Sequence, residues 1–172
     1  KWPNGAEPLD LDDDGDLDLL VGSGFLTCQL VPWTADCGGL TWYENGAGWA
    51  RHDIVAPGAD GFFHRALRTD VDGDGRLDLV ATRESLATPF GSESFGRMEW
   101  FAGSKEGFVW QGELVEGGGS LPVLFDLDGD GDDDIVSGEY FAAPGGFAWF
   151  EKDGATYTRD RKSTRLNSSH QI

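Results

Sequence analysis

The feature that most constrains the fold of this chain is an Asp-rich nine-residue segment that occurs three times. Asp70–Asp78 reads DVDGDGRLD, with carboxylates at positions 1, 3, 5 and 9 and glycine at position 6. Asp10–Asp18 and Asp126–Asp134 keep the same four carboxylates and the same glycine. Ca²⁺ takes about six to eight oxygen ligands, and a tight loop offers them from alternate side chains and from the carbonyl at position 7. The repetition therefore predicts three calcium-binding loops.

The expected cofactor is Ca²⁺, about three ions, bound by the side chains at positions 1, 3, 5 and 9 and by the carbonyl at position 7. The predicted ligands of the three ions are Asp10, Asp12, Asp14, Asp16 and Asp18; Asp70, Asp72, Asp74, Arg76 and Asp78; and Asp126, Asp128, Asp130, Asp132 and Asp134. Zinc would favour His or Cys ligands. The alternative of Asp-Gly turns that bind no metal stays open. A structural role is expected for the ions, because each would cross-link a loop that joins two strands.

The residues that follow each loop argue against an EF-hand. That motif needs a Glu at position 12 and helices on both sides, but position 12 is Val21, Ala81 and Ser137 in the three copies. Short runs rich in Leu, Val and Ile follow the loops, as is typical of strands.

The loops mark a long repeat, with 60 residues from Asp10 to Asp70 and 56 from Asp70 to Asp126. Each unit contains about four short predicted strands, with the Asp-rich loop between the first two. A four-strand unit repeated at this spacing is typical of propeller blades. The predicted units are residues 1–56 (incomplete at its N-terminal side), 57–118 and 119–159 (expected to be truncated).

An aromatic pair recurs in phase with the loops, as Trp42-Tyr43, Trp100-Phe101 and Trp149-Phe150. These residues alternate within predicted strands, so core packing is favoured over the stacking of carbohydrate rings.

With these motifs, residues 1–159 resemble the FG-GAP/VCBS-type repeat proteins, whose DxDxDGxxD loops bind calcium between the strands of β-propeller blades. The resemblance implies an all-β fold, a partial β-propeller with about three four-stranded blades of a larger ring. It also implies that the partners include the remaining blades of the parent protein. One departure is Asp133, which stands where the other loops have Leu17 and Leu77, so the inward packing expected of those leucines is in doubt there.

The formal charge of −18 argues against nucleic acid and anionic membranes as partners. No apolar run approaches the roughly eighteen residues of a membrane span.

The chain begins at Lys1 without a Met, so its true N-terminus is expected to be absent. The segment 160–172 turns basic and polar and looks like translated sequencing adapter, so it is left out of the fold and function predictions.

The two cysteines, Cys28 and Cys37, lie in a stretch with turn residues. A disulfide is predicted, as in secreted proteins. Two free thiols and half of a zinc site are the alternatives, and the second lacks CxxC spacing and nearby His partners.

The favoured function is a non-catalytic, calcium-binding extracellular module, secreted or attached to a bacterial cell surface, for adhesion to a protein or a glycan. The alternative is the propeller domain of a carbohydrate-active enzyme, of the polysaccharide lyase or sugar dehydratase type, with the long loops Cys28–Gly39 and Glu84–Gly96 lining its active face. His52 and His64 are candidates for a general base or a substrate contact. Neither has a converging partner in the sequence, so surface or packing roles are favoured and no catalytic residue is predicted.

Overall fold

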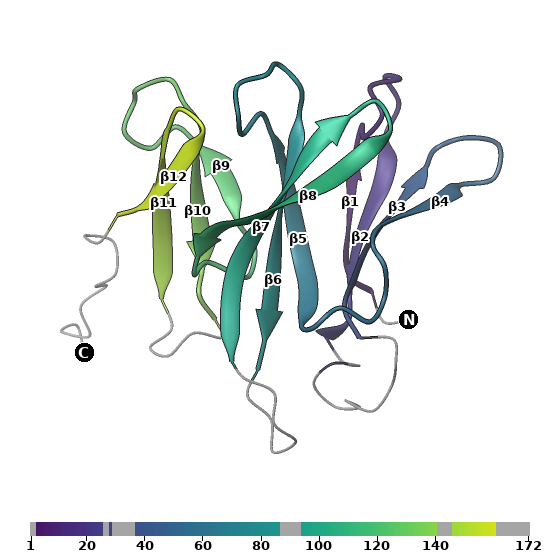
Figure 1. The fold of residues 1–172 in the computed structure, drawn as a ribbon, viewed down its shortest axis with the longest axis horizontal. Coiled ribbons are helices and arrows are strands. Elements are labelled where there is room, and N and C mark those ends of the chain that lie inside the picture. The colour runs from purple at the N-terminus through teal and green to yellow at the C-terminus, as the bar shows by residue number, and fades with distance from the viewer. Residues whose placement is uncertain (1–2, 26–27, 29–36, 87–93, 141–145, 161–172) are drawn as a thin grey trace, which may run out of the picture.

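The computed structural model describes residues 3–25, 28, 37–86, 94–140 and 146–160, and these form an all-β fold of three four-stranded antiparallel sheets (Figure 1). The first sheet contains β1 (Pro3–Leu9), β2 (Asp18–Ser23), β3 (Gly39–Glu44) and β4 (Ala50–Val55). The second contains β5 (Phe62–Thr69), β6 (Asp78–Ser85), β7 (Phe95–Ser104) and β8 (Gly107–Glu116). The third contains β9 (Val123–Phe125), β10 (Asp134–Gly138), β11 (Phe147–Asp153) and β12 (Thr156–Arg159).

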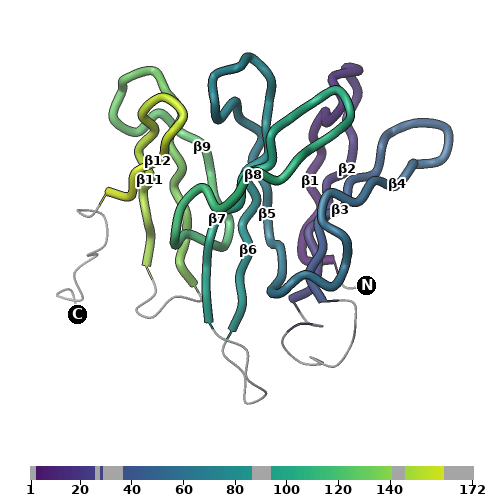
Figure 2. The backbone as a smooth tube through the Cα atoms, in the orientation of Figure 1, coloured from purple at the N-terminus to yellow at the C-terminus, as the bar shows by residue number. Residues whose placement is uncertain are grey.

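Each sheet is a simple meander in which every strand pairs with the next strand of the chain. The three sheets stand side by side in chain order, with the second in the middle (Figure 2). This arrangement is that of consecutive propeller blades, so the predicted partial β-propeller of three four-stranded blades is confirmed.

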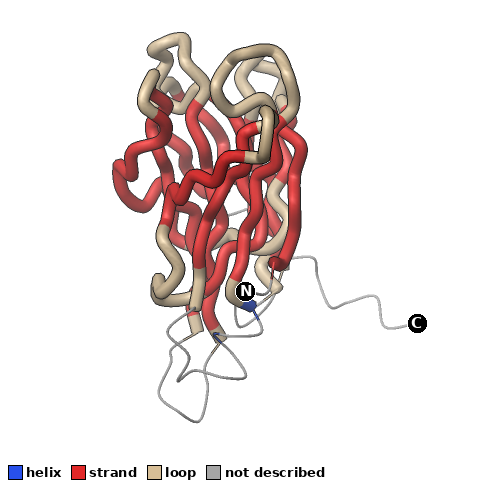
Figure 3. The backbone as a smooth tube through the Cα atoms, turned by 90° about the vertical axis from the view of Figure 1, so that its right-hand side faces the viewer, coloured by secondary structure: helices blue, strands red, loops and turns tan. Residues whose placement is uncertain are grey.

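The connections gather at the two ends of the strands (Figure 3). The Asp-rich loops are the β1–β2, β5–β6 and β9–β10 connections, and all three lie at the upper end in Figure 1. We call this the metal-loop end. The connections from the second to the third strand of each sheet leave from the opposite end. Residues 26–27 and 29–36, 87–93 and 141–145 in these connections lie outside the described residues, as does 161–172. Most of both long loops predicted to line an active face is therefore not described.

Two hydrophobic cores hold the sheets together, one in each space between neighbouring sheets. The first contains Leu20 and Trp42 of the first sheet and Leu79, Ala81 and Phe101 of the second. Successive side chains of a strand point to opposite faces, so Val80 packs instead into the second core, with Met98, Ile135, Ala148 and Phe150. The middle sheet is thus covered on both faces.

The aromatic pairs follow this alternation. Trp42, Phe101 and Phe150 are buried in the cores, and Trp100 packs against the second core from β7. Core packing therefore accounts for at least one ring of each pair.

The third sheet has one apolar face that no described sheet covers. Val123, Val136 and Trp149 form a cross-strand row on the face opposite Ile135 and Phe150. Phe125 and Phe147 belong to the same face by alternation and are 61% and 58% exposed. We call these five residues the open face of the third sheet.

The expectation about position 8 of the loops is wrong. Leu17 and Leu77 do not pack inward, because their side chains are 57% and 41% exposed. Position 2 points inward in the first two loops, since Leu11 and Val71 are buried in the first and second cores, whereas Leu127 of the third loop is 47% exposed. Asp133 in the third loop is therefore exposed like its leucine counterparts.

Cys28 and Cys37 form the predicted disulfide, with 4.8 Å between their Cα atoms. The N–H of Gly38 donates to the Cys28 sulfur at 3.1 Å. The bridge ties the β2–β3 connection to the start of β3.

Within the described residues, no helix is long and apolar enough to cross a membrane.

One glycine is required by a close approach at the metal-loop end. A Cβ on Gly103, in β7, would lie 2.3 Å from the carbonyl oxygen of Leu77. Gly103→Ala is expected to lower the free energy of unfolding by about 1–3 kcal/mol, the usual cost of overpacking. Gly46 in the β3–β4 turn has open space around the same position, so Gly46→Ala is the matched control, expected to change stability by less than about 0.5 kcal/mol. Urea unfolding of both variants measures the difference, and equal stabilities would contradict the close approach.

Candidate metal centres

Each Asp-rich loop brings three carboxylates together. One oxygen from each member of the group lies within 4.8 Å of the others, in the groups Asp10, Asp12 and Asp18; Asp70, Asp72 and Asp78; and Asp126, Asp128 and Asp130. Positions 1 and 3 therefore belong to every group. The carboxylates of Asp14, Asp74 and Asp134, also predicted as ligands, lie outside these groups.

The loops are shaped by aspartates that accept hydrogen bonds from backbone N–H groups a few residues further on. In the second loop, Asp70 accepts from Gly73 at 2.8 Å, Asp72 from Asp74 at 3.1 Å and Asp74 from Arg76 at 2.8 Å. The other two loops repeat all three bonds at 2.7–3.2 Å. Such side-chain-to-backbone bonds are the reason that Asp is favoured in turns. The spacing of the carboxylates is thus fixed by the backbone that carries them.

Two positions of each loop need a left-handed backbone. At position 6, φ is +94° for Gly15, +85° for Gly75 and +100° for Gly131, where glycine has no Cβ to hinder the turn. At position 4, φ is also positive, and the first loop there has Asp13 with φ +64°. Aspartate is one of the few other residues that adopt this conformation readily.

The aspartate at position 9 is the structural anchor of each loop. Asp18, Asp78 and Asp134 are buried, and each accepts two backbone hydrogen bonds. One oxygen of Asp78 accepts from Val71 N at 3.0 Å, and the other accepts from Gly103 N at 2.7 Å in the β7–β8 hairpin. The bonds from Leu11 and Asn45 to Asp18, and from Leu127 and Lys152 to Asp134, repeat this arrangement at 2.8–3.2 Å. Each carboxylate therefore links its loop to the last hairpin of its sheet.

The remaining carboxylates of the loops repel one another. The pKa values of Asp12, Asp16 and Asp128 are raised, first by partial loss of hydration and then by neighbouring aspartates such as Asp14 and Asp130. A bound cation would relieve this repulsion. The donor set consists of carboxylates and backbone carbonyls, the oxygen ligands that Ca²⁺ prefers, so the residues present fit a calcium ion.

Two loops are also tied to the sheet that follows them in the chain. Arg68 in β5 donates to the carboxylate of Asp13 at 2.6 Å, which joins the first loop to the second sheet. Lys152 in β11 donates from Nζ to the backbone carbonyl of Asp70 at 2.8 Å, which joins the second loop to the third sheet. Sequence reasoning missed both contacts, because 55 and 82 residues separate the partners.

The structure gives both candidate histidines a carboxylate partner. Nε2 of His52 lies 2.9 Å from Glu44 in an exposed pair, whereas Nδ1 of His64 lies 3.0 Å from the buried Glu84. His52 also stacks on Trp42, with 4.3 Å between the ring centroids. No local sequence signal joins His64 to Glu84, since the contact depends on the pairing of β5 with β6.

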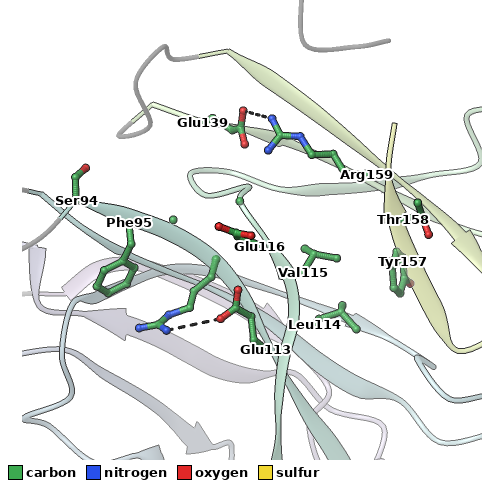
Figure 4. Close-up of a pocket in the computed structure, with 13 residues that line it drawn as sticks. Ser94, Phe95, Glu113, Leu114, Val115, Glu116, Glu139, Tyr157, Thr158 and Arg159 are labelled. Atoms are coloured by element: carbon green, nitrogen blue, oxygen red, sulfur yellow. Dashed lines mark hydrogen bonds and ion pairs between the residues drawn. The ribbon is translucent and has the colours of Figure 1, made fainter. Parts of the chain in front are cut away.

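A cavity of about 1190 Å³ lies between the outer strands of the second and third sheets (Figure 4). Two ion pairs lie in its lining, Arg159 with Glu139 at 2.7 Å and Arg97 with Glu113 at 3.7 Å. Each pair joins residues of one sheet, and the cavity is a polar seam between two blades.

Comparison with known proteins agrees with the repeat pattern. Residues 70–137 match the family model described as FG-GAP-like repeat. The match begins at the first aspartate of the second loop and contains the whole of the third loop. None of the curated proteins matches the chain. The part of the chain from the second Asp-rich loop to β10 therefore matches an FG-GAP-like repeat, within a structure of three four-stranded blades.

Proposed function

We propose that this chain is an extracellular, calcium-binding β-propeller module that interacts with a protein or a glycan, with about three Ca²⁺ ions in structural roles. The observation that carries the proposal is the oxygen cluster repeated in all three loops at one end of the molecule. The disulfide supports an extracellular location, since disulfides persist in oxidising compartments.

A calcium titration of the chelator-treated chain tests the metal sites directly. Calorimetry is expected to detect about three ions, with Kd of about 10⁻⁴–10⁻³ M as in other extracellular calcium modules. Asp12→Asn, Asp72→Asn and Asp128→Asn are each expected to remove one ion from the stoichiometry. Asp133→Asn is the matched control, because Asp133 lies at the exposed position 8 of the third loop. Absence of binding at about ten times these concentrations would contradict the proposal.

We also propose that the open face of the third sheet packs against a further blade of the parent protein. Contiguous exposed apolar surface marks an interaction site, and the covered face of the same sheet packs against a blade in this way. In isolation the chain is then expected to self-associate through this face. Sedimentation velocity is expected to show concentration-dependent association that the double variant Phe125→Ser/Phe147→Ser abolishes. Trp110→Ser on β8, an exposed aromatic of another sheet, serves as the control, and a concentration-independent monomer would contradict the expectation.

A further inference from the structure

A cavity of about 540 Å³ lies where the first strands of the three sheets converge, at the end opposite the metal loops. All three sheets contribute to its lining, through Glu7 in β1, His64 and Arg65 in β5, Ser120 and Leu121 before β9, and Tyr140 after β10. Its volume is within the range of small-molecule sites. We call it the axial pocket.

A β-bulge places two neighbouring polar residues in this pocket. Adjacent residues of a regular strand point to opposite faces, yet His64 and Arg65 both line the cavity. Between the pairs Phe63–Arg83 and Ala66–Ala81, β5 has one more residue than β6. The buried Thr82 hydroxyl stabilises the bulge, since it lies 3.2 Å from both the N and the O atoms of Arg65. Bulges redirect side chains and are frequent beside active sites.

A buried carboxylate holds the histidine in place. Glu84 is 1% exposed, and its oxygens lie 3.0 Å from His64 Nδ1, 3.2 Å from Ser120 N and 3.0 Å from Ser120 Oγ. The contact requires a glycine at position 119, where a Cβ would lie 2.1 Å from Glu84 Oε1. An ionised carboxylate only accepts hydrogen bonds, so the Nδ1 atom that faces Glu84 carries a proton. His64 is thus oriented by residues of two sheets.

The basic side chains of the axial pocket each face a carboxylate. Arg65 pairs with Glu7 at 3.2 Å, and Nδ1 of His64 lies 3.0 Å from Glu84. No excess positive charge is left for an anionic ligand, and the chain as a whole carries −18. The lining also includes the aromatic rings of Phe25, 5.9 Å from the His64 ring, and of Tyr140, which is 79% exposed. Leu121 lines the pocket with φ +59°, a backbone strain of the kind found at ligand sites.

We propose that the axial pocket is a binding site for a neutral saccharide. Hydroxyl groups both donate and accept, so they can bond to the His64 ring, to the Arg65–Glu7 pair and to Ser120 without leaving a charge unpaired. The aromatic and apolar residues of the lining would cover the less polar face of a sugar ring. The inference deepens the proposed function, because it names one class of ligand for the module. It rests on the proposed function only in assuming that the module binds a ligand. The pocket itself shares no residue with the metal loops.

The test follows the histidine rings by NMR in the calcium-saturated chain labelled at histidine. The probes are the methyl glycosides of glucose, galactose and mannose, each at up to about 50 mM, enough to saturate a site with a millimolar Kd. At least one glycoside is expected to shift the His64 ring signals in a saturable way and to leave His52 unchanged. Galacturonate, the charged counterpart of galactose, is expected to bind at least about tenfold more weakly than the best neutral probe.

Two variants make the test specific to the pocket. His64→Phe keeps an aromatic ring but removes both ring nitrogens, and is expected to weaken binding about tenfold by calorimetry. His52→Phe is the matched control, because His52 also pairs with a glutamate but lies outside the pocket. Tyr140→Ala, at a largely exposed residue, provides a second variant that keeps the fold and is expected to weaken binding.

Preferential binding of galacturonate, no shift with any neutral probe, or equal affinity in wild type and His64→Phe would each overturn the inference. The metal proposal is measured separately by the calcium titration. Calcium binding without sugar binding would refute only the axial pocket, and sugar binding without calcium binding would refute only the metal sites.

Discussion

Saturating Ca²⁺ is expected to raise the melting temperature of the chelator-treated chain by about 5–10 °C for each occupied loop. A ligand at about a hundred times its Kd stabilises the folded state by about 2.7 kcal/mol, and about 1 kcal/mol corresponds to about 2–4 °C in a chain of this size. The physical source is the relief of repulsion among carboxylates held within 4.8 Å of one another. Differential scanning calorimetry with Ca²⁺ and with chelator measures the shift.

Magnesium at the same concentration is the control ion. Because Mg²⁺ demands compact octahedral geometry and gives up its water reluctantly, it is expected to raise the melting temperature much less. A folded chain whose melting temperature is the same with Ca²⁺ and with chelator would show that the loops are not metal sites.

The second large effect is expected at Asp78, whose two oxygens accept hydrogen bonds from Val71 N and Gly103 N. Asp78→Ala leaves the buried N–H of Val71 and the part-buried N–H of Gly103 without an acceptor, at a cost of about 1–3 kcal/mol each. The variant is therefore expected to lose about 2–6 kcal/mol of unfolding free energy, measured by urea unfolding in the presence of chelator.

Asp72→Asn is the matched comparison, because Asp72 is exposed and lies in the same loop. It is expected to lower stability only in the presence of Ca²⁺, whereas Asp78→Ala lowers stability with and without the ion. Wild-type stability of Asp78→Ala in chelator would contradict the anchoring role of position 9.

The sequence predicted the parts of this molecule that depend on local spacing. The loops follow from aspartates that bond to backbone N–H groups two to five residues away, and the strands follow from short apolar runs beside them. Position 8 was misjudged, because a leucine beside a predicted strand looks like a core residue. Only the packing of the sheets shows that position 2 of the first two loops, such as Val71, points inward.

The axial pocket could not be predicted from the sequence, because it depends on contacts between residues that are far apart in the chain. Its central contact joins Glu84 to Ser120, 36 residues further along the chain and in another sheet. The bulge at His64 and Arg65 breaks the alternation on which strand prediction depends. Contacts that arise only when sheets meet leave no periodic signal in the sequence.

The two ties between a metal loop and the next sheet have a consequence for how the repeats assemble. Repeats in one chain can exchange neighbours during folding, and misassembly of this kind is a characteristic failure of repeat proteins. Here the first tie uses a guanidinium on the first strand of the second sheet and a side-chain carboxylate, whereas the second uses an ammonium on the third strand of the third sheet and a backbone carbonyl. If the second sheet docked elsewhere, the largely buried guanidinium of Arg68 would lose its carboxylate partner. The two interfaces between blades therefore use different contacts, although the three Asp-rich loops share their aspartates at positions 1, 3, 5 and 9.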